Sequence, residues 1–435
     1  MQDKKPKVVS KEILLPFIMV TSLFALWGFA NDITNPMVAA FRTIMEISNA
    51  KAALIQLAFY GGYGTMAIPA ALFINRFSYK KGLLLGLGLY AAGALLFWPA
   101  AAFEFFGFFL LSLYILTFGL AFLETTANPY ILMMGHPATA TRRLNLAQSF
   151  NPLGSLIGMA VASQVILTSL DSEKRDAITG ELLFPMLSEA KKAAIRTHDL
   201  MIIRDPYVIL GVVVIIMFFL ILIMNMPERE NPNKHASPKA MMKRLFANKV
   251  FRGGVIAQMF YVAAQIMCWT FIIQYAERLG ISKADAQLYN IGAMIMFVSS
   301  RFISTFMMKY LNPSLMLAVY AVGGILTSSG AILIDGMGGL YSLMAISFFM
   351  SLMFPTIYGI ALKDVGDDAT LGSAFLVMAI VGGALMPPLQ GAIIDLGSVA
   401  GFPAVNFSFI LPLVCFVIIA LYGYRTIQTM SVATN

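Results

Sequence analysis

Two acidic side chains, Asp32 and Glu124, lie within long apolar stretches of this sequence. A charged side chain at the centre of a bilayer costs about 2.5 to 3.5 kcal/mol even on lenient scales, so an acid at that depth usually faces a cavity and has a function. The sequence places no Lys or Arg of the same half at comparable depth, and burial without a cationic partner favours the protonated carboxyl group. Both acids are therefore candidates to bind and release a proton; the alternative is a hydrogen-bonded packing role.

Uncharged amides accompany these acids in the apolar stretches: Asn31, Asn35, Asn128, Gln148, Asn151 and Gln164 in the first half, and Gln265 and Asn290 in the second. Carboxylates and amides together supply donors and acceptors that suit the vicinal hydroxyl groups of a sugar. Trp27 and Trp269 could stack on the apolar face of a sugar ring. The alternative for any single amide is an interhelical hydrogen bond, which we expect for about half of them.

The elements that carry these residues are predicted to be membrane-spanning helices. The chain has 435 residues, of which 59% are hydrophobic and 12% charged, whereas about 25% are charged in a soluble protein. This composition excludes a soluble enzyme, a secreted disulfide scaffold and a disordered chain. We expect an all-α membrane protein with twelve spans, at 13–39, 52–75, 82–103, 107–134, 143–170, 206–226, 250–279, 284–309, 315–335, 339–362, 371–395 and 404–425.

The charge distribution predicts the orientation of the chain. The net charge is +8, and Lys and Arg gather in the short loops on one side, which is typical of membrane topology rather than of nucleic-acid binding. The positive-inside rule places both termini in the cytoplasm. Cys268 and Cys415 lie inside apolar runs, so we expect neither a disulfide framework nor a metal site.

The chain is predicted to consist of two six-helix halves, 1–226 and 250–435, joined by a basic cytoplasmic linker at 227–249. Within the first half, the stretches 28–36 and 121–129 both end in Asn-Pro, which indicates a repeat. Three-helix repeats of opposite topology are common in secondary transporters.

Enzyme signatures are absent from the sequence. It contains no Walker A motif, no Gly-x-Ser-x-Gly and no Cys/His zinc spacing, and His136, His198 and His235 are expected in loops. We therefore expect a protein that is not an enzyme and that needs no cofactor. Transport without an ATP site must draw on an ion gradient, with a proton as the coupling ion.

Several segments carry a resemblance to a known family: 96–101, 123–129, 143–151, 261–269, 355–357 and 372–383. On these segments the chain resembles the bacterial L-fucose–proton symporters of the major facilitator superfamily over nearly its whole length. The resemblance implies that superfamily's fold, alternating access, hexose uptake and a place in the bacterial inner membrane. It places the family's intramembrane glutamate on Glu124 and a family glutamine on Gln164. The family's first-span aspartate falls on Asn35, so Asp32 is shifted by about one helical turn.

The sequence as a whole predicts a proton-coupled sugar symporter, with L-fucose as the first choice of substrate. Glucose, galactose or another monosaccharide is the alternative, followed by an exporter or a non-transporting nutrient receptor on the same fold. The expected partners are the sugar and the lipid bilayer, with no nucleic acid, and the expected state is a multi-pass monomer. Glu124 and Asp32 are expected to couple to protons, and the amides with Trp269 to bind the sugar.

Overall fold

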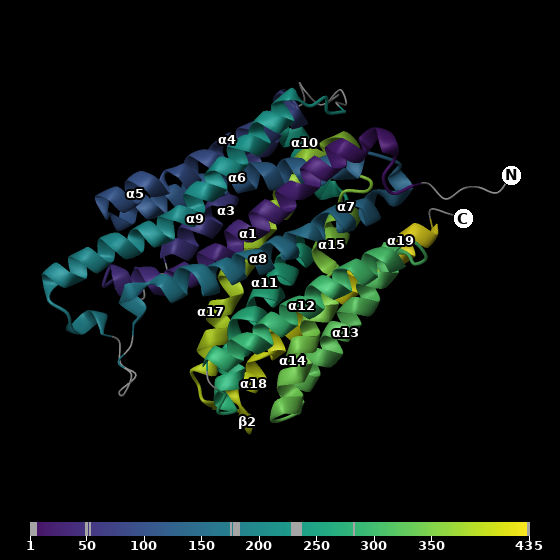
Figure 1. Cartoon of the computed structure of the whole chain (residues 1–435). Helices are drawn as coiled ribbons and strands as arrows, with labels where there is room; N and C mark the ends of the chain where they lie inside the picture. Colours follow the sequence, from purple (N-terminus) through teal and green to yellow (C-terminus); the bar gives the residue numbers. More distant parts are fainter. Residues whose placement is uncertain are drawn as a thin grey trace. The chain divides into compact units, whose positions relative to one another are not determined.

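The computed structural model describes residues 7–47, 51, 54–174, 176, 183–227, 237–281 and 283–432. Almost all of these residues are helical (Figure 1). Among them, twelve helical segments are long and apolar enough to cross a membrane, which confirms the predicted number of spans. Large apolar side chains lie on the outside of the helices, as on α9, where Ile209, Ile216 and Ile223 are exposed. Such exposure is expected where lipid, and not water, surrounds the protein.

Among the described residues, eight α-helices make up most of the first six spans. In chain order these are α1 (Leu14–Ile44), α3 (Leu54–Arg76), α4 (Tyr79–Leu95), α5 (Phe97–Phe103), α6 (Phe106–Met133), α7 (Ala140–Gln148), α8 (Phe150–Val161) and α9 (Glu189–Ile223).

A short helix of the predicted linker precedes the last six spans. Near the end of the sequence, a two-stranded antiparallel hairpin connects the eleventh span to the twelfth. In chain order these elements are α10 (Pro238–Ala247), α11 (Lys249–Arg278), α12 (Lys283–Met307), α13 (Pro313–Leu333), α14 (Met337–Met350), α15 (Met353–Ala361), α16 (Ala369–Met378), α17 (Gly382–Ile394), β1 (Ser398–Val399), β2 (Phe402–Pro403), α18 (Ala404–Ser408) and α19 (Ile410–Val432).

Local sequence signals explain several of these boundaries. The Asn248 side chain accepts hydrogen bonds from the N–H groups of Val250 and Phe251 and thereby caps α11. Asn312 caps α13 in the same way, with Pro313 at the first helical position. Both residue types are favoured there because they satisfy N–H groups that the first helical turn leaves unpaired.

The predicted start of the sixth span is wrong. Helix α9 begins at Glu189, 17 residues before the predicted position 206, and it includes His198, which was expected in a loop. A hydropathy criterion finds only the apolar part of a helix, whereas this extension is polar and has partners of its own. Lys192 and Arg196 form ion pairs of 2.7 and 3.3 Å with Glu46, which follows the end of α1.

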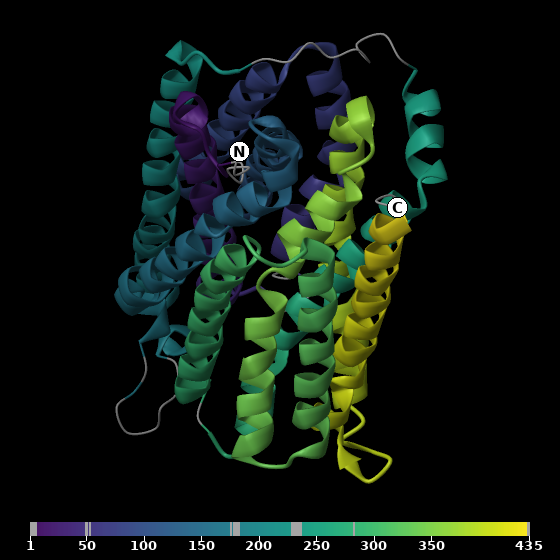
Figure 2. The same ribbon diagram turned by 90° about the vertical axis from the view of Figure 1, so that its right-hand side faces the viewer.

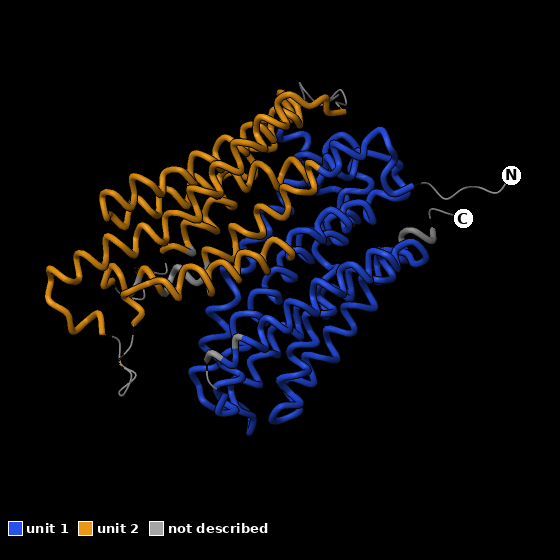
Figure 3. Tube along the Cα trace, viewed as in Figure 1, with its two compact units in different colours: residues 1–18, 128–152, 229–435 blue, residues 19–127, 153–228 orange. Residues whose placement is uncertain are grey.

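The described contacts divide the chain into two compact units (Figure 3). Unit 1 comprises Met1–Ile18, Asn128–Pro152 and Arg229–Asn435, and unit 2 comprises Met19–Ala127 and Leu153–Glu228. Residues 128–152, where the fourth span ends and the fifth begins, therefore group with the second half of the sequence. Within unit 1, α7 packs against α12 and α15.

Each unit has its own helix packing. In unit 2, α4 and α5 both pack along α9. In unit 1, α13 packs against α14 and α19, and α11 packs against α15, α17 and α19. Figure 2 shows α19 at the C-terminal end of the chain, with the β1–β2 hairpin at the far end of this helix from the C-terminus. Each unit thus presents a stable helical framework for the polar residues inside it.

Candidate functional site

Helices α1 and α6 hold the two predicted acids inside unit 2. Glu124 is buried, with 8% of its surface exposed, and it lies nine residues, about 14 Å, before the end of α6. Asp32 and its neighbour Asn31 are half-buried on α1. Because α1 continues to Ile44, beyond the predicted end of the span, Asp32 lies twelve residues from the end of its helix. Both acids are therefore in the interior of long helices, where a charge is costly.

Two tyrosines of α3 accompany these acids and were missed by the sequence analysis. Tyr60 lies within electrostatic reach of Asp32, and Tyr63 lies within reach of Glu124. The tyrosines are three residues apart and occupy neighbouring positions on the helix surface. A phenol can donate or accept a hydrogen bond, so it can serve a carboxyl group in either protonation state. In the sequence, the pair of tyrosines on either side of Gly61 and Gly62 in an apolar span could have marked them as candidates. Only the structure shows which acids these tyrosines lie near.

Close helix packing fixes the positions of these groups. A Cβ atom added at Gly62 of α3 would lie 2.7 Å from Cβ of Thr117, so only glycine lets α3 approach α6 this closely. A Cβ atom at Gly154 of α8 would lie 1.9 Å from the carbonyl oxygen of Ala25 on α1. On α1, the hydroxyl of Thr34 is also 2.8 Å from that of Tyr207. These contacts hold the helices of the acids with little freedom to shift.

A second polar group lies in unit 1, around the start of the fifth span. The Nε2 atom of Gln148 donates a 2.7 Å hydrogen bond to Oδ1 of Asn128. Asn145 donates from Nδ2 to the hydroxyl of Thr356 on α15, at 3.2 Å. The carbonyl of Gln148 accepts a 3.2 Å bond from Nη1 of Arg301 on α12. The first half of the sequence is thereby linked to α12 and α15 of the second half.

Arg143 of α7 stabilises the end of α6 next to this group. Its guanidinium donates from Nε to the carbonyl of Ile131 at 2.7 Å and from Nη2 to the carbonyl of Leu132 at 2.6 Å. These carbonyls belong to the last turn of α6, which has no intrahelical donors for them, and a cation there also interacts favourably with the helix dipole. The segment 143–151, which carries part of the family resemblance, thus includes a residue with a structural role.

The predicted sugar-binding residues of the second half lie on α11 and α12. The indole nitrogen of Trp269 donates a 3.1 Å hydrogen bond to Ser347, and its ring meets Phe297 edge-on at 5.1 Å. Gln265 and Asn290 are half-buried. These three side chains therefore keep part of their surface accessible within unit 1.

The remaining predicted residues differ from one another in burial and location. Gln164 is exposed in a π-helical turn that follows α8, and Asn151 is half-buried at the start of α8. The side chain of Asn35 lies outside the described part of the chain. Trp27 is 3% exposed and packs edge-on against Phe24 at 4.4 Å, so its ring belongs to the core of unit 2. Both acids thus lie in unit 2, each within electrostatic reach of a tyrosine of α3, and the bonded amides Asn128 and Gln148 lie in unit 1.

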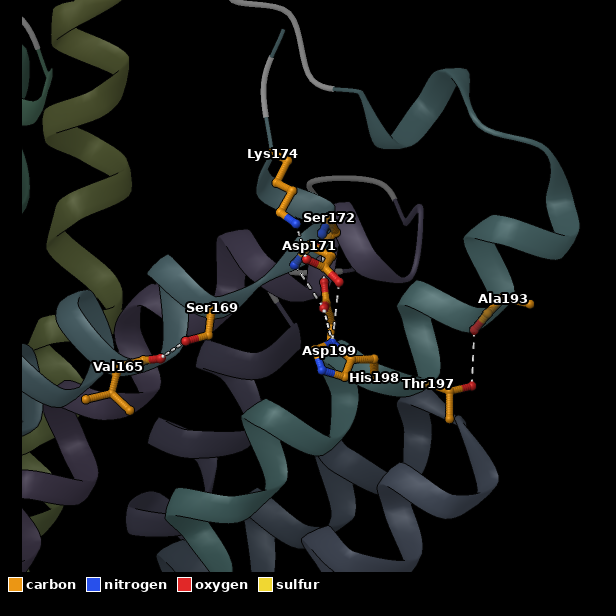
Figure 4. Close-up of polar contacts among 9 residues, drawn as sticks. All are labelled: Val165, Ser169, Asp171, Ser172, Lys174, Ala193, Thr197, His198 and Asp199. Atoms are coloured by element: carbon orange, nitrogen blue, oxygen red, sulfur yellow. Dashed lines mark hydrogen bonds and ion pairs between the residues drawn. The ribbon is translucent and has the colours of Figure 1, made fainter. Parts of the chain in front are cut away.

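A cluster of metal-ligating types lies apart from these groups, where the segment after α8 meets α9 (Figure 4). Possible ligand atoms of Asp171, His198 and Asp199 lie within 4.8 Å of one another. The carboxylate of Asp199 already accepts bonds from the N–H groups of Asp171 and Ser172, and Asp171 pairs with Lys174 at 2.6 Å. Because these partners occupy the carboxylates, we assign the cluster to fastening the segment onto α9.

Comparison with known proteins agrees with this architecture. Residues 19–387 match the model of the Major Facilitator Superfamily. The chain is 66% identical over 420 residues to a protein of Haemophilus influenzae named L-fucose-proton symporter, covering 96% of this chain and 98% of the relative. It is 29% identical over 412 residues to a glucose/galactose transporter of Brucella abortus, covering 93% of this chain and 92% of the relative.

A solved structure extends the match to three dimensions. The chain has a TM-score of 0.87 and 32% identity to the crystal structure of the transporter FucP in the outward conformation, covering 96% of this chain and 99% of that one. This agreement confirms the predicted fold of a multi-pass membrane transporter. The chain belongs to the major facilitator superfamily and, within it, to the family of L-fucose–proton symporters.

Proposed function

We propose that this chain imports L-fucose together with a proton by alternating access in the bacterial inner membrane. The observation that carries the proposal is the buried carboxyl of Glu124 in the interior of α6, in a chain that is 66% identical to a relative named L-fucose-proton symporter. The lower identity of 29% to a glucose/galactose transporter makes those sugars the alternative substrates. The mobile bodies are the halves 1–226 and 250–435 joined by the linker 227–249, with both termini in the cytoplasm.

Glu124 and Asp32 carry the coupling proton in this mechanism. The carboxyl group of Glu124 is nearly inaccessible, so its charged form is disfavoured there and its protonated form predominates when the carrier is loaded from outside. Tyr63 and Tyr60 lie within electrostatic reach of the two acids. We propose that during the cycle their hydroxyl groups donate to the carboxylate form and accept from the carboxylic acid. Deprotonation on the cytoplasmic side then resets the carrier.

The amides and Trp269 bind the sugar. The proposed set comprises Asn31, Asn35, Asn128, Gln148, Asn151, Gln164, Gln265 and Asn290. Their amide groups match the hydroxyl groups of a hexose, while the Trp269 ring, held by Ser347, offers an apolar surface to the ring carbons. The Gln148–Asn128 bond uses part of this capacity in the present conformation. The sugar and a proton are the only ligands proposed, and the transporter acts as a monomer without nucleic acid or a prosthetic group.

Release of the sugar requires the contacts around α7 to open. Asn145 with Thr356 and the Gln148 carbonyl with Arg301 join the start of the fifth span to α12 and α15. In the proposed topology these contacts lie toward the cytoplasm, so they close that side. The relative FucP was solved in an outward conformation, which supports this assignment.

The proposal is tested in proteoliposomes that contain the whole chain. Addition of L-fucose without an imposed gradient should make the outside solution more alkaline, because each sugar enters with a proton. A protonophore should abolish accumulation. Uptake that leaves the external pH unchanged and is insensitive to the protonophore would contradict proton coupling, and alkalinisation by glucose but not by L-fucose would assign the alternative substrate.

Substitution of Glu124 tests the residue that carries the proposal. Glu124→Gln cannot lose a proton, so gradient-driven accumulation should disappear while exchange of L-fucose across the membrane continues. Glu104→Gln is the matched control, because Glu104 lies at the end of α5 and bonds to Thr197. Accumulation that persists in Glu124→Gln would refute the role of this residue.

A further inference from the structure

Three buried polar side chains of unit 1 form a group that the proposed mechanism does not use. Gln258 and Tyr261 lie on α11 with no exposed surface, and Arg301 lies on α12 with 4% exposed. The two helices pack against each other, and Tyr261 lies within electrostatic reach of Arg301. We call these three residues the inner polar group.

The hydrogen-bonding capacity of the inner polar group is largely unused. Both amide atoms of Gln258 have no hydrogen-bond partner among the described residues. The hydroxyl of Tyr261 and Nε of Arg301 have no described partner with full hydrogen-bond geometry, but their side chains lie close enough to interact with each other. Arg301 forms no ion pair with a described carboxylate; its guanidinium lies 4.7 Å from the centre of the Phe297 ring and bonds to the carbonyl of Gln148. Buried polar groups are costly when unsatisfied, so a cluster of them indicates a second conformation in which they bind something.

The inner polar group continues the stripe of proposed sugar-binding residues along α11. Gln258, Tyr261, Gln265 and Trp269 follow one another at intervals of three, four and four residues, which places them on one face of a helix. Gln258 lies nine residues, about 14 Å, from the first residue of α11, and Trp269 lies about 16 Å farther on. In the proposed topology α11 starts at the cytoplasm, so the inner polar group lies between Trp269 and the cytoplasmic side.

The carbonyl of Gln148 covers this group in the present conformation. It belongs to α7, whose contacts with α12 and α15 are those that must open for release. When α7 moves away, Arg301 loses its bond to this carbonyl, and its donors become accessible together with Tyr261 and Gln258. An amide, a phenol and a guanidinium offer both donors and acceptors, as the hydroxyl groups of a neutral sugar require.

We propose that Gln258, Tyr261 and Arg301 form an inner subsite for a neutral monosaccharide, which the sugar occupies on its way to the cytoplasm after α7 moves away. This inference rests on the proposed function, because it assumes that a sugar crosses between the halves. It adds a second binding position on the cytoplasmic side of Gln265 and Trp269. Sugar approaching from outside meets this subsite last, and sugar approaching from the cytoplasm meets it first.

The test compares sugar affinity at the two faces of the protein. Exchange of radiolabelled L-fucose is measured with a protonophore present, in vesicles of right-side-out and of inside-out orientation. Gln258→Leu and Tyr261→Phe should raise the half-saturating concentration at the cytoplasmic face by about fivefold to tenfold, as expected for one lost hydrogen bond to a ligand. The value at the outer face should change by less than about twofold, which also shows that the variants fold.

Matched controls separate this effect from the general loss of a buried polar group. The Tyr422 hydroxyl on α19 and Oε1 of Gln390 on α17 are also buried without a hydrogen-bond partner among the described residues, but they lie outside the α11 stripe. Tyr422→Phe and Gln390→Leu should leave the ratio of the two affinities unchanged.

Three results would overturn the inner subsite. An equal loss of affinity at both faces would place the residues in the central site, and no change at either face would assign them a structural role. A change of ratio in the control variants would show that the effect is not local. Failure of the wild-type protein to exchange L-fucose would instead refute the proposed function, so the two failures are distinguishable.

Discussion

Arg143 and Arg301 are both buried arginines of unit 1, yet they differ in how their donors are used. Arg143 donates to the carbonyls of Ile131 and Leu132, to the Thr139 hydroxyl and to two further carbonyls. Arg301 donates to a single described carbonyl, that of Gln148, and its side chain lies close to the Tyr261 hydroxyl, while its Nε has no described partner with full hydrogen-bond geometry. A buried group that stabilises a single conformation is expected to use all its hydrogen-bond donors. A group that acts in two conformations is expected to leave some donors unused in each of them.

The locations of the two arginines agree with this difference. The two shortest bonds of Arg143 reach carbonyls 12 and 11 positions away along the chain, at the end of α6, so they join two neighbouring stretches of the first half. Arg301 is bonded to a residue 153 positions away, on a helix that moves in the proposed mechanism. We therefore assign stability chiefly to Arg143 and transport chiefly to Arg301.

The largest expected effect is the loss of Arg143. Arg143→Ala leaves the carbonyls of Ile131 and Leu132 buried without donors, and the free energy of unfolding should fall by about 3 kcal/mol. Thermal unfolding of the detergent-solubilised protein measures this loss. Arg142→Ala is the control, because Arg142 donates only one described bond, to the carbonyl of Thr305. Equal stability of the two variants would remove the distinction between the arginines.

Substitution of Arg301 should affect transport more than stability. Arg301→Lys keeps the charge but loses the planar set of donors. The initial rate of L-fucose uptake per folded protein should fall by about tenfold, while the free energy of unfolding changes by less than about 1 kcal/mol. Uptake and thermal unfolding are measured on one preparation. Normal uptake combined with a loss of stability as large as that of Arg143→Ala would reverse our assignment.

A smaller effect is expected at the contact between Asn145 and Thr356. Asn145→Ala removes the contact with Thr356, at 3.2 and 3.4 Å, as well as a bond to the Thr141 carbonyl within its own helix. Loss of the neutral contact with Thr356, worth about 1 kcal/mol, should make the form with an open cytoplasmic side about fivefold more populated. Hydrogen exchange of the α15 amides should then be faster. Ser149→Ala is the control, because its hydroxyl bonds to the carbonyl of Asn145 within the same stretch of chain. Unchanged hydrogen exchange in Asn145→Ala would show that this contact is not among those that must open for release of the sugar.

Hydropathy predicted the spans well because lipid imposes the same requirement on every helix that crosses it. It failed where a helix leaves the membrane, as in the polar extension of α9 from Glu189, which is stabilised by ion pairs with Glu46. The break between α14 and α15 lies close to Pro355, and proline bends helices. The break between α16 and α17 lies beside Gly382, where a Cβ atom would lie 2.2 Å from the carbonyl oxygen of Met259 on α11. A local sequence pattern thus determined where helices form and where they are interrupted.

The candidate site was only partly predictable. Glu124 and Asp32 were found because a charge in an apolar stretch is visible in the sequence, and the same rule applied to the second half would have found Arg301. Tyr60 and Tyr63 could not be assigned, because their relation to the acids depends on how α3 packs against α1 and α6. The role of Arg143 was also hidden, since its partners are backbone carbonyls, which every residue has.

The smallest expected effect concerns Asp171, which is half-buried, and its exposed partner Lys174, a solvent-accessible pair that contrasts with both buried arginines. The hydrogen bond from Lys174 is the main reason that the pKa of the Asp171 carboxyl lies below its ordinary value. A carboxyl whose pKa is lowered on folding stabilises the structure above its unfolded pKa of about 3.9, and this contribution is lost as the pH falls through the folded value. Hydrogen exchange at 171–174, corrected for intrinsic rates, should therefore stay slow at neutral pH and become faster below about pH 4.

Lys174→Ala isolates this pair from the other titratable groups near it. Asp199 and His198 also face Asp171 and are unchanged in the variant, so only the part of the acid transition that depends on Lys174 should move. Without its partner, Asp171 should titrate closer to its ordinary pKa, and the segment should loosen at a higher pH than in the wild-type protein. An unchanged transition would mean that Asp199, which accepts the N–H groups of Asp171 and Ser172, holds the segment by itself. Because the pair is exposed to solvent, transport should be unaffected, in contrast to the loss expected for Arg301→Lys.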